Sequence, residues 1–341
     1  MRRLIAIVVY LLTAVSCVHQ FPVPAPAPLV LSLVFDKGLA QGPVVDLTTR
    51  SSEASEFYDI RYVIHAFEKI GNNKYSDTPY AQFVFSEDDI TNLDNTLTLF
   101  IMEGEYRIMI WADYVVQGSV EDLYYNPSDF KFVKLYGRDE GKDHVGNTDF
   151  RDAFIGSVDV DVVRFASHFP PVSATVDMSR PMSKVVFITN DLLEWKIKVL
   201  TSEKYNTAFG EQTSKPSNVN FDDYIMKIHY PQYMPNAFNV HSDRTTWSDA
   251  NVSFSSRLIP MSESEASIGF DYVFANAKDA NVVMAISLWD KKGNQLSRSH
   301  DITVPLDRGK VTTVRGSFLL EDSDGGVSIN PDFEGEFNIV I

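Results

Sequence analysis

The sequence predicts an all-β protein made of two β-sandwiches in tandem, and three observations lead to this prediction. Apolar and polar residues alternate with a period of two in many short runs, as in Tyr58–Phe67. Asn, Asp and Gly, which favour turns, separate these runs. Amphipathic helical periodicity over a dozen residues is missing; only 149–154 and 190–193 could each form a helical turn. The length of 341 residues favours two domains.

Residues 1–16 are expected to be a signal peptide. The basic pair Arg2–Arg3, the uncharged run Leu4–Leu12 and the small residue Ser16 precede Cys17, the single cysteine of the chain. The apolar run is shorter than the roughly 20 residues that span a bilayer. A cysteine placed directly after small residues resembles a bacterial lipoprotein signal, which implies that Cys17 is acylated, for example with palmitate. The alternative is an ordinary secretory signal with a chance cysteine.

Residues 17–28 are expected to form a tether. Proline occupies every second position from 22 to 28, which fixes φ, removes backbone donors and favours extended polyproline II. At ~3.1 Å per residue, about ten residues would hold a folded body roughly 30 Å from a lipid headgroup.

The first sandwich is assigned to residues 29–179. Its expected strands are Leu29–Phe35, Tyr58–Phe67, Gln82–Phe85, Thr96–Ile101, Gly104–Ala112 and Val172–Met178. In Tyr58–Phe67, Arg61 and His65 lie on the more polar face. A charged loop, Tyr136–His144, interrupts the pattern.

The second sandwich is assigned to residues 180–341, after a hinge at Arg180–Pro181. Its expected strands are Ser183–Thr189, Tyr224–Tyr230, Val252–Phe254, Ser267–Phe274, Val282–Trp289, Asp301–Pro305, Lys310–Phe318 and Glu336–Ile341. A hairpin turn is expected to begin at Asp290.

The charge balance excludes some partners. The chain has 46 acidic and 30 basic residues, a net charge of −16, which becomes −18 when the two arginines of the signal peptide are removed. Nucleic acid and anionic lipid surfaces bind basic patches, so neither is expected as an electrostatic partner. No second long apolar run is present, so lipid alone is expected to hold the body at a membrane.

Motifs that would carry catalysis or bind a cofactor are absent. The sequence has no nucleophile elbow, phosphate-binding glycine loop, HExxH motif or Cys/His metal cluster, and its seven histidines are scattered. We therefore expect no enzyme activity, no cofactor and no metal site. The acidic segment 321–326 lacks the spacing of an EF-hand loop, which favours a solvated turn. The aromatic residues Tyr124, Tyr125, Trp247 and those of 230–233 could stack on sugar rings, or could belong to the core.

Three motifs resemble one known family. They are the Arg-Pro-hydrophobic-small-Lys step within Thr175–Phe187, the segment Asp152–Gly156, and the stretch Val304–Gly316 before the last strand. This organisation is similar to that of the fimbrillin-like lipoproteins of Bacteroidales type V pili. The chain departs from the family at Ile155, where an aromatic residue is common.

The resemblance implies two tandem transthyretin-like Greek-key sandwiches, exported as lipoproteins to the outer membrane of a Gram-negative bacterium. Members that form the pilus shaft are cut after Arg or Lys, which removes the first strand and opens a groove for a strand of another subunit; anchor members stay uncut. Here the removed strand would be Leu29–Phe35, alone or continued through Val44–Leu47. The candidate cleavage site is Arg50, in a polar stretch, whereas Arg61 lies within a strand and should be protected. The alternative for Arg50 is an ordinary surface-loop residue.

The candidate donor strand is the last one, in which Phe337, Ile339 and Ile341 share a face. This strand could instead complete its own sheet. Together these features predict a lipid-anchored, adhesive or structural pilus subunit, anchor or accessory protein, with membrane lipid and other pilus or surface proteins as partners. A second interpretation is a surface glycan-binding lipoprotein of a polysaccharide-uptake system, with host or microbial glycans as ligands.

Overall fold

The computed structural model describes residues 25–35, 58–86, 95–136, 144–163, 171–201, 218–278, 280–320, 328–330 and 336–340. Strands dominate these residues, and one α-helix, α2 (Leu192–Thr201), accompanies them. The strands of the first half are β1 (Ala27–Phe35), β2 (Tyr58–Gly71), β3 (Lys74–Tyr75), β4 (Ala81–Phe85), β5 (Thr96–Ile101), β6 (Gly104–Val116), β7 (Tyr125–Asn126), β8 (Val133–Leu135), β9 (Ala153–Val162) and β10 (Val172–Met178). Those of the second half are β11 (Met182–Thr189), β12 (Tyr224–Asn239), β13 (Arg244–Ser256), β14 (Ile259–Pro260), β15 (Ala266–Phe274), β16 (Ala280–Asp290), β17 (Gln295–Arg298), β18 (Ile302–Leu306), β19 (Val311–Gly316), β20 (Ser328–Asn330) and β21 (Glu336–Val340). Within the described ranges there are also two short 3-10 helices, η3 (Asp149–Arg151) and η4 (Phe221–Asp223).

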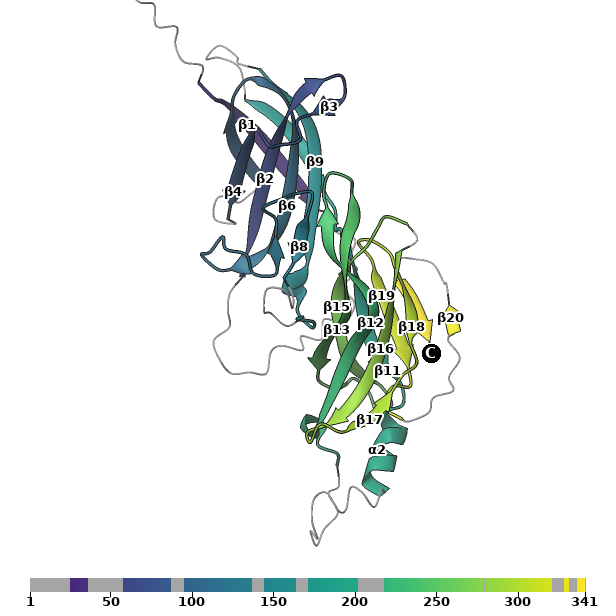
Figure 1. Cartoon of the computed structure of the whole chain (residues 1–341). Coiled ribbons are helices and arrows are strands. Elements are labelled where there is room, and N and C mark those ends of the chain that lie inside the picture. The colour runs from purple at the N-terminus through teal and green to yellow at the C-terminus, as the bar shows by residue number, and fades with distance from the viewer. Residues whose placement is uncertain are drawn as a thin grey trace, which may run out of the picture.

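The first lobe packs a three-stranded sheet against a five-stranded sheet (Figure 1). The small sheet has the order β10-β1-β5, and the larger one has the order β3-β2-β6-β9 with β4 also paired to β2. Alternation explains the small sheet, since every second residue of β1 and β5 is buried and the residues between them are exposed or half-buried. The buried rows of both sheets meet in one apolar core.

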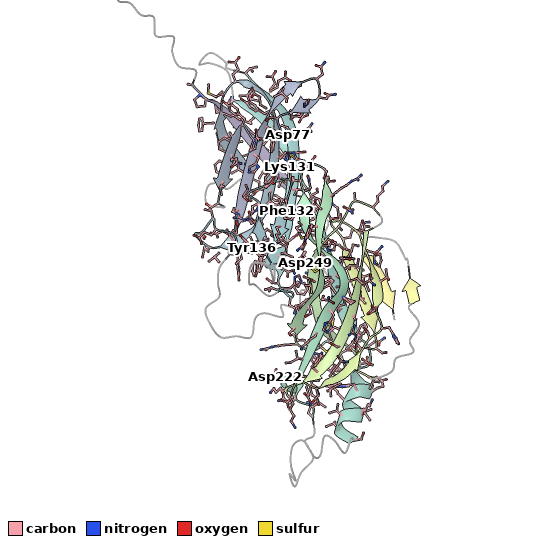
Figure 2. The ribbon with its side chains drawn as sticks, viewed as in Figure 1. Asp77, Lys131, Phe132, Tyr136, Asp222 and Asp249 are labelled. Carbon is pink, nitrogen blue, oxygen red and sulfur yellow. The ribbon has the colours of Figure 1, made fainter. Side chains whose placement is uncertain are left out.

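The larger sheet of this lobe is covered on both faces. Seven consecutive residues of β2, Arg61–Phe67, are buried, so the face that carries Arg61 and His65 does not meet solvent. The β7–β8 loop covers it: the ring of Phe130 stacks on that of His65 with centroids 4.0 Å apart. Lys131 of this loop ion-pairs with Asp77 of the first lobe at 3.4 Å (Figure 2).

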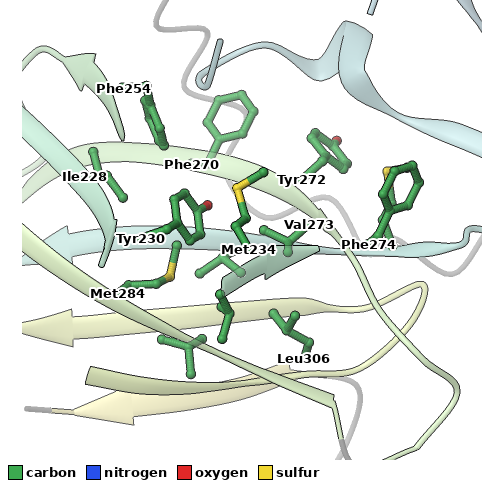
Figure 3. Packing of buried hydrophobic residues seen from close by; sticks show 14 of the residues in the cluster. Ile228, Tyr230, Met234, Phe254, Phe270, Tyr272, Val273, Phe274, Met284 and Leu306 are labelled. Atoms are coloured by element: carbon green, nitrogen blue, oxygen red, sulfur yellow. The ribbon is translucent and has the colours of Figure 1, made fainter. Parts of the chain in front are cut away.

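The second lobe packs a six-stranded sheet, β14-β15-β11-β19-β21-β20, against a seven-stranded sheet in which β12 is paired with β13, β16 and β8. Figure 3 shows the packing between these sheets, where rings and methionines from β12, β13, β15 and β16 interdigitate. The same apolar cluster continues into the first lobe through Trp111 and Tyr125. The ring of Phe274 lies 6.3 Å from Trp111 and 5.6 Å from Tyr125, so the two lobes share a core.

The predicted all-β sandwich fold is confirmed. The turn predicted at Asp290 is present, since the amides of Lys292 and Asn294 donate to its carboxylate at 2.9 and 2.8 Å. The helical turn expected at 190–193 is the start of the longer helix α2. Ala27 and Pro28, counted in the tether, are the first residues of β1. Among the described residues, no helix is both long and apolar enough to cross a membrane.

Candidate functional site: the β1 slot and the lobe junction

Strand β1 is the middle strand of its sheet. It runs parallel to β10, with Leu29 opposite Val172 and Phe35 opposite Met178. On its other edge it runs antiparallel to β5, with Leu31 opposite Leu97. The chain before residue 36 therefore supplies a strand whose removal would separate β10 from β5 and leave the facing backbone groups of both without partners. We call this position the β1 slot.

The inward face of β1 is apolar and buried. Leu29 and Leu31 are fully buried and Leu33 is 3% exposed, whereas Val34 on the outward face is 52% exposed. Burial of a leucine side chain contributes about 1.5–3 kcal/mol, so the three leucines together contribute about 5–9 kcal/mol to keeping the strand in place. The inward face of this position is thus filled by apolar residues at every second position of β1.

The slot ends in an aromatic contact. The ring of Phe35 packs edge-on against Phe154 of β9, with centroids 5.0 Å apart, and against Tyr62 of β2, with centroids 6.4 Å apart. The guanidinium carbon of Arg180 lies 4.5 Å from the centroid of the Phe154 ring. Cation–π contacts of this kind contribute about 0.5–2 kcal/mol.

The second feature is a strap, residues 144–152, which enters the second lobe before the chain returns to the first lobe in β9. The amide of Asn147 donates to the Phe270 carbonyl at 2.9 Å, and its side-chain oxygen accepts from the Phe270 amide at 2.8 Å. A Cβ at Gly146 would lie 2.2 Å from the ring of Phe254, and one at Gly269 would lie 2.6 Å from Asn147 Oδ1. Glycine is thus required for this close approach.

Arg151 anchors the strap in the second lobe. Its guanidinium donates to the Asp271 carboxylate, to the carbonyl of Tyr272 at 3.0 Å and to the carbonyl of Val145 at 2.7 Å. Asp271 also contacts His144 Nε2 at 2.8 Å and accepts from the Tyr230 hydroxyl. Burial alone would raise the pKa of Asp271, but the charge of Arg151, with these hydrogen bonds, lowers it below its usual value.

Adjacent residues of the strap contact different lobes. Phe150 stacks on Tyr58 of β2, with centroids 3.8 Å apart, and packs edge-on against Tyr114 of β6. Asp149 accepts from Lys184 Nζ at 2.6 Å and from the Tyr272 hydroxyl at 2.8 Å, both in the second lobe. The strap therefore joins the lobes with an aromatic contact on one side and polar contacts on the other.

Arg180 and Asp152 form the contact between the strap and the chain connecting β10 to β11. Arg180 Nε donates to both carboxylate oxygens of Asp152, at 3.0 and 2.9 Å. Burial raises the pKa of Asp152 to about 6, although Arg180 opposes this increase. The predicted hinge position, Arg180–Pro181, carries a largely buried ion pair. In addition, Arg308 Nε donates to the Arg180 carbonyl at 3.2 Å.

The described residues do not include three of the sites predicted from the sequence, Cys17, Arg50 and Ile341, or the acidic segment 321–326. Phe337 and Ile339 belong to β21, which runs parallel to β19 of its own sheet and antiparallel to β20.

Arg61 is 3% exposed, and it forms two hydrogen bonds with Asp113, at 3.0 and 2.8 Å. Arg61 therefore lies within a strand, as predicted, with a buried and hydrogen-bonded side chain.

The predicted ligand-contact aromatics separate into two groups. Tyr125 is 1% exposed, and its hydroxyl donates to the Arg151 carbonyl at 2.6 Å, so it is a core residue of the junction and not a surface contact. Tyr230 is also fully buried, and its hydroxyl donates to the Asp271 carboxylate. Tyr124 is partly buried against the core. Trp247 is 55% exposed on β13 and Tyr233 is 74% exposed on β12.

The helical turn predicted at 149–154 forms in part as η3 (Asp149–Arg151), but no local pattern indicated the contacts that the strap makes with the second lobe. Asp271 lies 127 positions from His144 and 120 from Arg151 in the chain, so only the fold brings it to these two strap residues. No group of three or more His, Cys, Asp or Glu side chains that could hold a metal ion occurs within the described ranges.

Comparison with known proteins gives a family and a set of similar folds. A family model described as a family of unknown function (DUF6562) matches residues 29–341. No curated protein matches the chain. A candidate cell adhesion protein from Bacteroides eggerthii has 12% identity and a TM-score of 0.46, with 93% of this chain and 95% of that one covered.

Two further structures have similar values. The fimbrial anchor protein Mfa2 from Porphyromonas gingivalis has 13% identity and a TM-score of 0.39, with 80% of this chain and 82% of that one covered. A fimbrial assembly protein from Parabacteroides distasonis has 11% identity and a TM-score of 0.40, with 86% and 92% covered. At these values the similarity says nothing about a ligand or partner of this chain.

Proposed function

The chain belongs to this family of unknown function, and we propose that it is a non-catalytic, lipid-anchored surface protein of fimbrial type, a pilus subunit, anchor or accessory protein that assembles by exchange of a β-strand. The observation that carries the proposal is the β1 slot. A single N-terminal strand lies between β10 and β5, and its inward face is made of buried leucines. A strand from another subunit with the same alternation would satisfy both the backbone groups and the apolar face of an emptied slot.

Release of β1 requires a cut between β1 and β2, and Arg50 is the candidate for it. Arg61, the first arginine of the described part of β2, has its guanidinium in ion pairs with Asp113 and Asp122. A trypsin-like protease therefore has no access to it in the folded chain. The candidate donor is the strand that contains Phe337, Ile339 and Ile341, whose alternation matches that of β1.

Strand exchange is tested by proteolysis. The protein is treated with an arginine-specific protease and analysed by SDS gel electrophoresis without heating. A shaft subunit gives ladders of SDS-resistant oligomers, and the Arg50→Gln variant gives none. If the cut protein remains a monomer and does not capture a synthetic β1 peptide, strand exchange is refuted.

The lipid anchor is tested separately. The motif around Cys17 supports acylation, which would place the folded body at the outer membrane. Cells that express the protein are labelled with palmitate and fractionated. Labelling and membrane association should both be lost in Cys17→Ala and kept in Ser16→Ala; label retained by Cys17→Ala would contradict the anchor.

A glycan-binding function is a second candidate, since Trp247 and Tyr233 are large aromatic side chains exposed on neighbouring strands. Exposed rings of this kind stack on sugar rings. Binding on a glycan array that is lost in Trp247→Ala and retained in Phe100→Ala, another exposed aromatic, would favour this function. No binding to any glycan on the array would remove it.

A further inference from the structure

We infer that the strand in the β1 slot controls the lobe junction, because its last residue, Phe35, supports the Phe154–Arg180–Asp152 contact that holds the strap. This inference rests on the proposed function, because it concerns what happens when the slot is emptied or refilled. A slot filled by a strand with an aromatic residue at the position of Phe35 keeps the two lobes in one fixed arrangement. An empty slot, or one filled without an aromatic residue at the position of Phe35, loosens the junction.

The first step is a chain of side-chain contacts. The Phe35 ring contacts Phe154 edge-on, at 5.0 Å and an interplanar angle of 87°. Phe154 is 7% exposed, and Arg180 lies against the same ring at 4.5 Å. Loss of Phe35 would open one side of Phe154 to water, which raises the local dielectric around the Arg180 ion pair and weakens it.

The second step leads from Arg180 to the strap. Its partner Asp152 is the last residue of the strap and adjoins Arg151, which reaches into the second lobe. The side chains of Arg180 and Asp152 are 11% and 9% exposed, so this ion pair depends on the packing that surrounds it. A displaced Arg180 would leave the Asp152 carboxylate buried without its cation, which is costly.

The backbone provides a second connection between β1 and the lobe junction. The β1–β10 pairing extends to Phe35 and Met178, and Ser179 then exchanges two hydrogen bonds with Ile155, at 2.9 and 2.8 Å. Next in the chain, Pro181 accepts at its carbonyl from the Ala275 amide of the second lobe at 3.0 Å. Strand β10, which would lose the hydrogen bonds along one edge if β1 were removed, is therefore the strand that leads into the junction.

The two routes converge at one register position. An incoming strand restores the ladder with β10 whatever its side chains are, but it restores the packing on Phe154 only with an aromatic residue opposite Met178. The slot thus favours an occupant with two properties: apolar residues at positions 29, 31 and 33, and an aromatic residue at position 35.

Amide hydrogen exchange of the full chain, followed by mass spectrometry, tests the inference. In Phe35→Ala, the amides of Asp152, Ile155 and Ser179 should exchange at least about fivefold faster than in the parent protein. Val34→Ala, in the same strand but 52% exposed, should leave these rates unchanged, and Phe35→Tyr should restore them. Equal rates in Phe35→Ala and Val34→Ala would overturn the inference.

A second comparison separates coupling from general loss of stability. Leu99→Ala removes a fully buried side chain from β5, on the side of β1 away from β10. If Leu99→Ala accelerates the junction amides as much as Phe35→Ala does, the coupling through Phe35 is wrong. In the Asp152→Asn background, where the contact with Arg180 is weakened, Phe35→Ala should increase the exchange rates of these amides by less than a further twofold. A further fivefold increase would also refute the coupling through Phe35. These rates are measured on uncut protein, so the outcome is independent of whether ladders form.

Discussion

Replacement of Leu31 by alanine should destabilise the protein more than any change on the outward face of β1. Leu31 is fully buried, opposite Leu97 on β5 and Ala174 on β10. A small residue already lies at 174, so the neighbouring side chains have little volume with which to fill the cavity. Leucine-to-alanine changes in such sites cost about 2–5 kcal/mol, and poor relaxation favours the upper half of this range.

The loss is measured by urea unfolding, followed by tryptophan fluorescence, for the parent protein, Leu31→Ala and the matched control Val34→Ala. Because Val34 is 52% exposed, its replacement should change the free energy of unfolding by no more than about 0.5 kcal/mol. If Leu31→Ala costs less than about 1 kcal/mol, or no more than the control, the slot is not held by its buried leucines as argued. A further expected result is faster uptake of a labelled β1 peptide by Leu31→Ala, since its own strand is held less tightly.

Three further predictions concern buried or closely packed positions. Burial lowers the pKa of His65 from 6.5 to about 4, so the unfolded chain binds an extra proton between these pH values. The free energy of unfolding should therefore fall by up to about 3 kcal/mol as the pH drops through this window. His65→Phe should flatten that slope in pH-dependent urea titrations; an unchanged slope would assign it to other groups. Gly146→Ala should lower the melting temperature, because its Cβ would overlap the Phe254 ring, and a melting temperature equal to the parent's would contradict this packing. Arg151→Met should cost about 3–5 kcal/mol in urea unfolding, because it leaves a buried carboxylate unpaired. Arg107→Met, at an exposed ion pair, should cost at most about 1 kcal/mol, and equal losses would refute the buried anchor.

The strands could be predicted because their side chains alternate locally. β1 and β5 show one buried and one exposed face, which is the pattern that their sequences predict. In β2 the alternation correctly predicted a strand but not the environment of its side chains. Arg61 and His65 were predicted to lie on a polar face, which the structure buries. Their partners, Asp113 and Phe130, lie some fifty residues or more further along the chain, beyond the reach of any local pattern.

The junction could not be predicted for the same reason. The strap has no periodicity, and its main anchor joins residues 120 positions apart. Tyr125 and Tyr230 were considered as surface aromatics, but each uses its hydroxyl to satisfy a buried polar group, which makes a core position acceptable for tyrosine. Arg180–Pro181 was predicted as a hinge, but its residue types alone could not reveal that Asp152 and Arg308 hold it.

The two neighbours of β1 give the slot a direction. Because β1 is parallel to β10 and antiparallel to β5, a replacement keeps both hydrogen-bond patterns only if it enters in the same N-to-C sense. Subunits linked in this way would all point the same way, and the resulting filament would be polar, with an unfilled groove at one tip and an undonated strand at the other. Growth and capping would then be distinct events at chemically different ends.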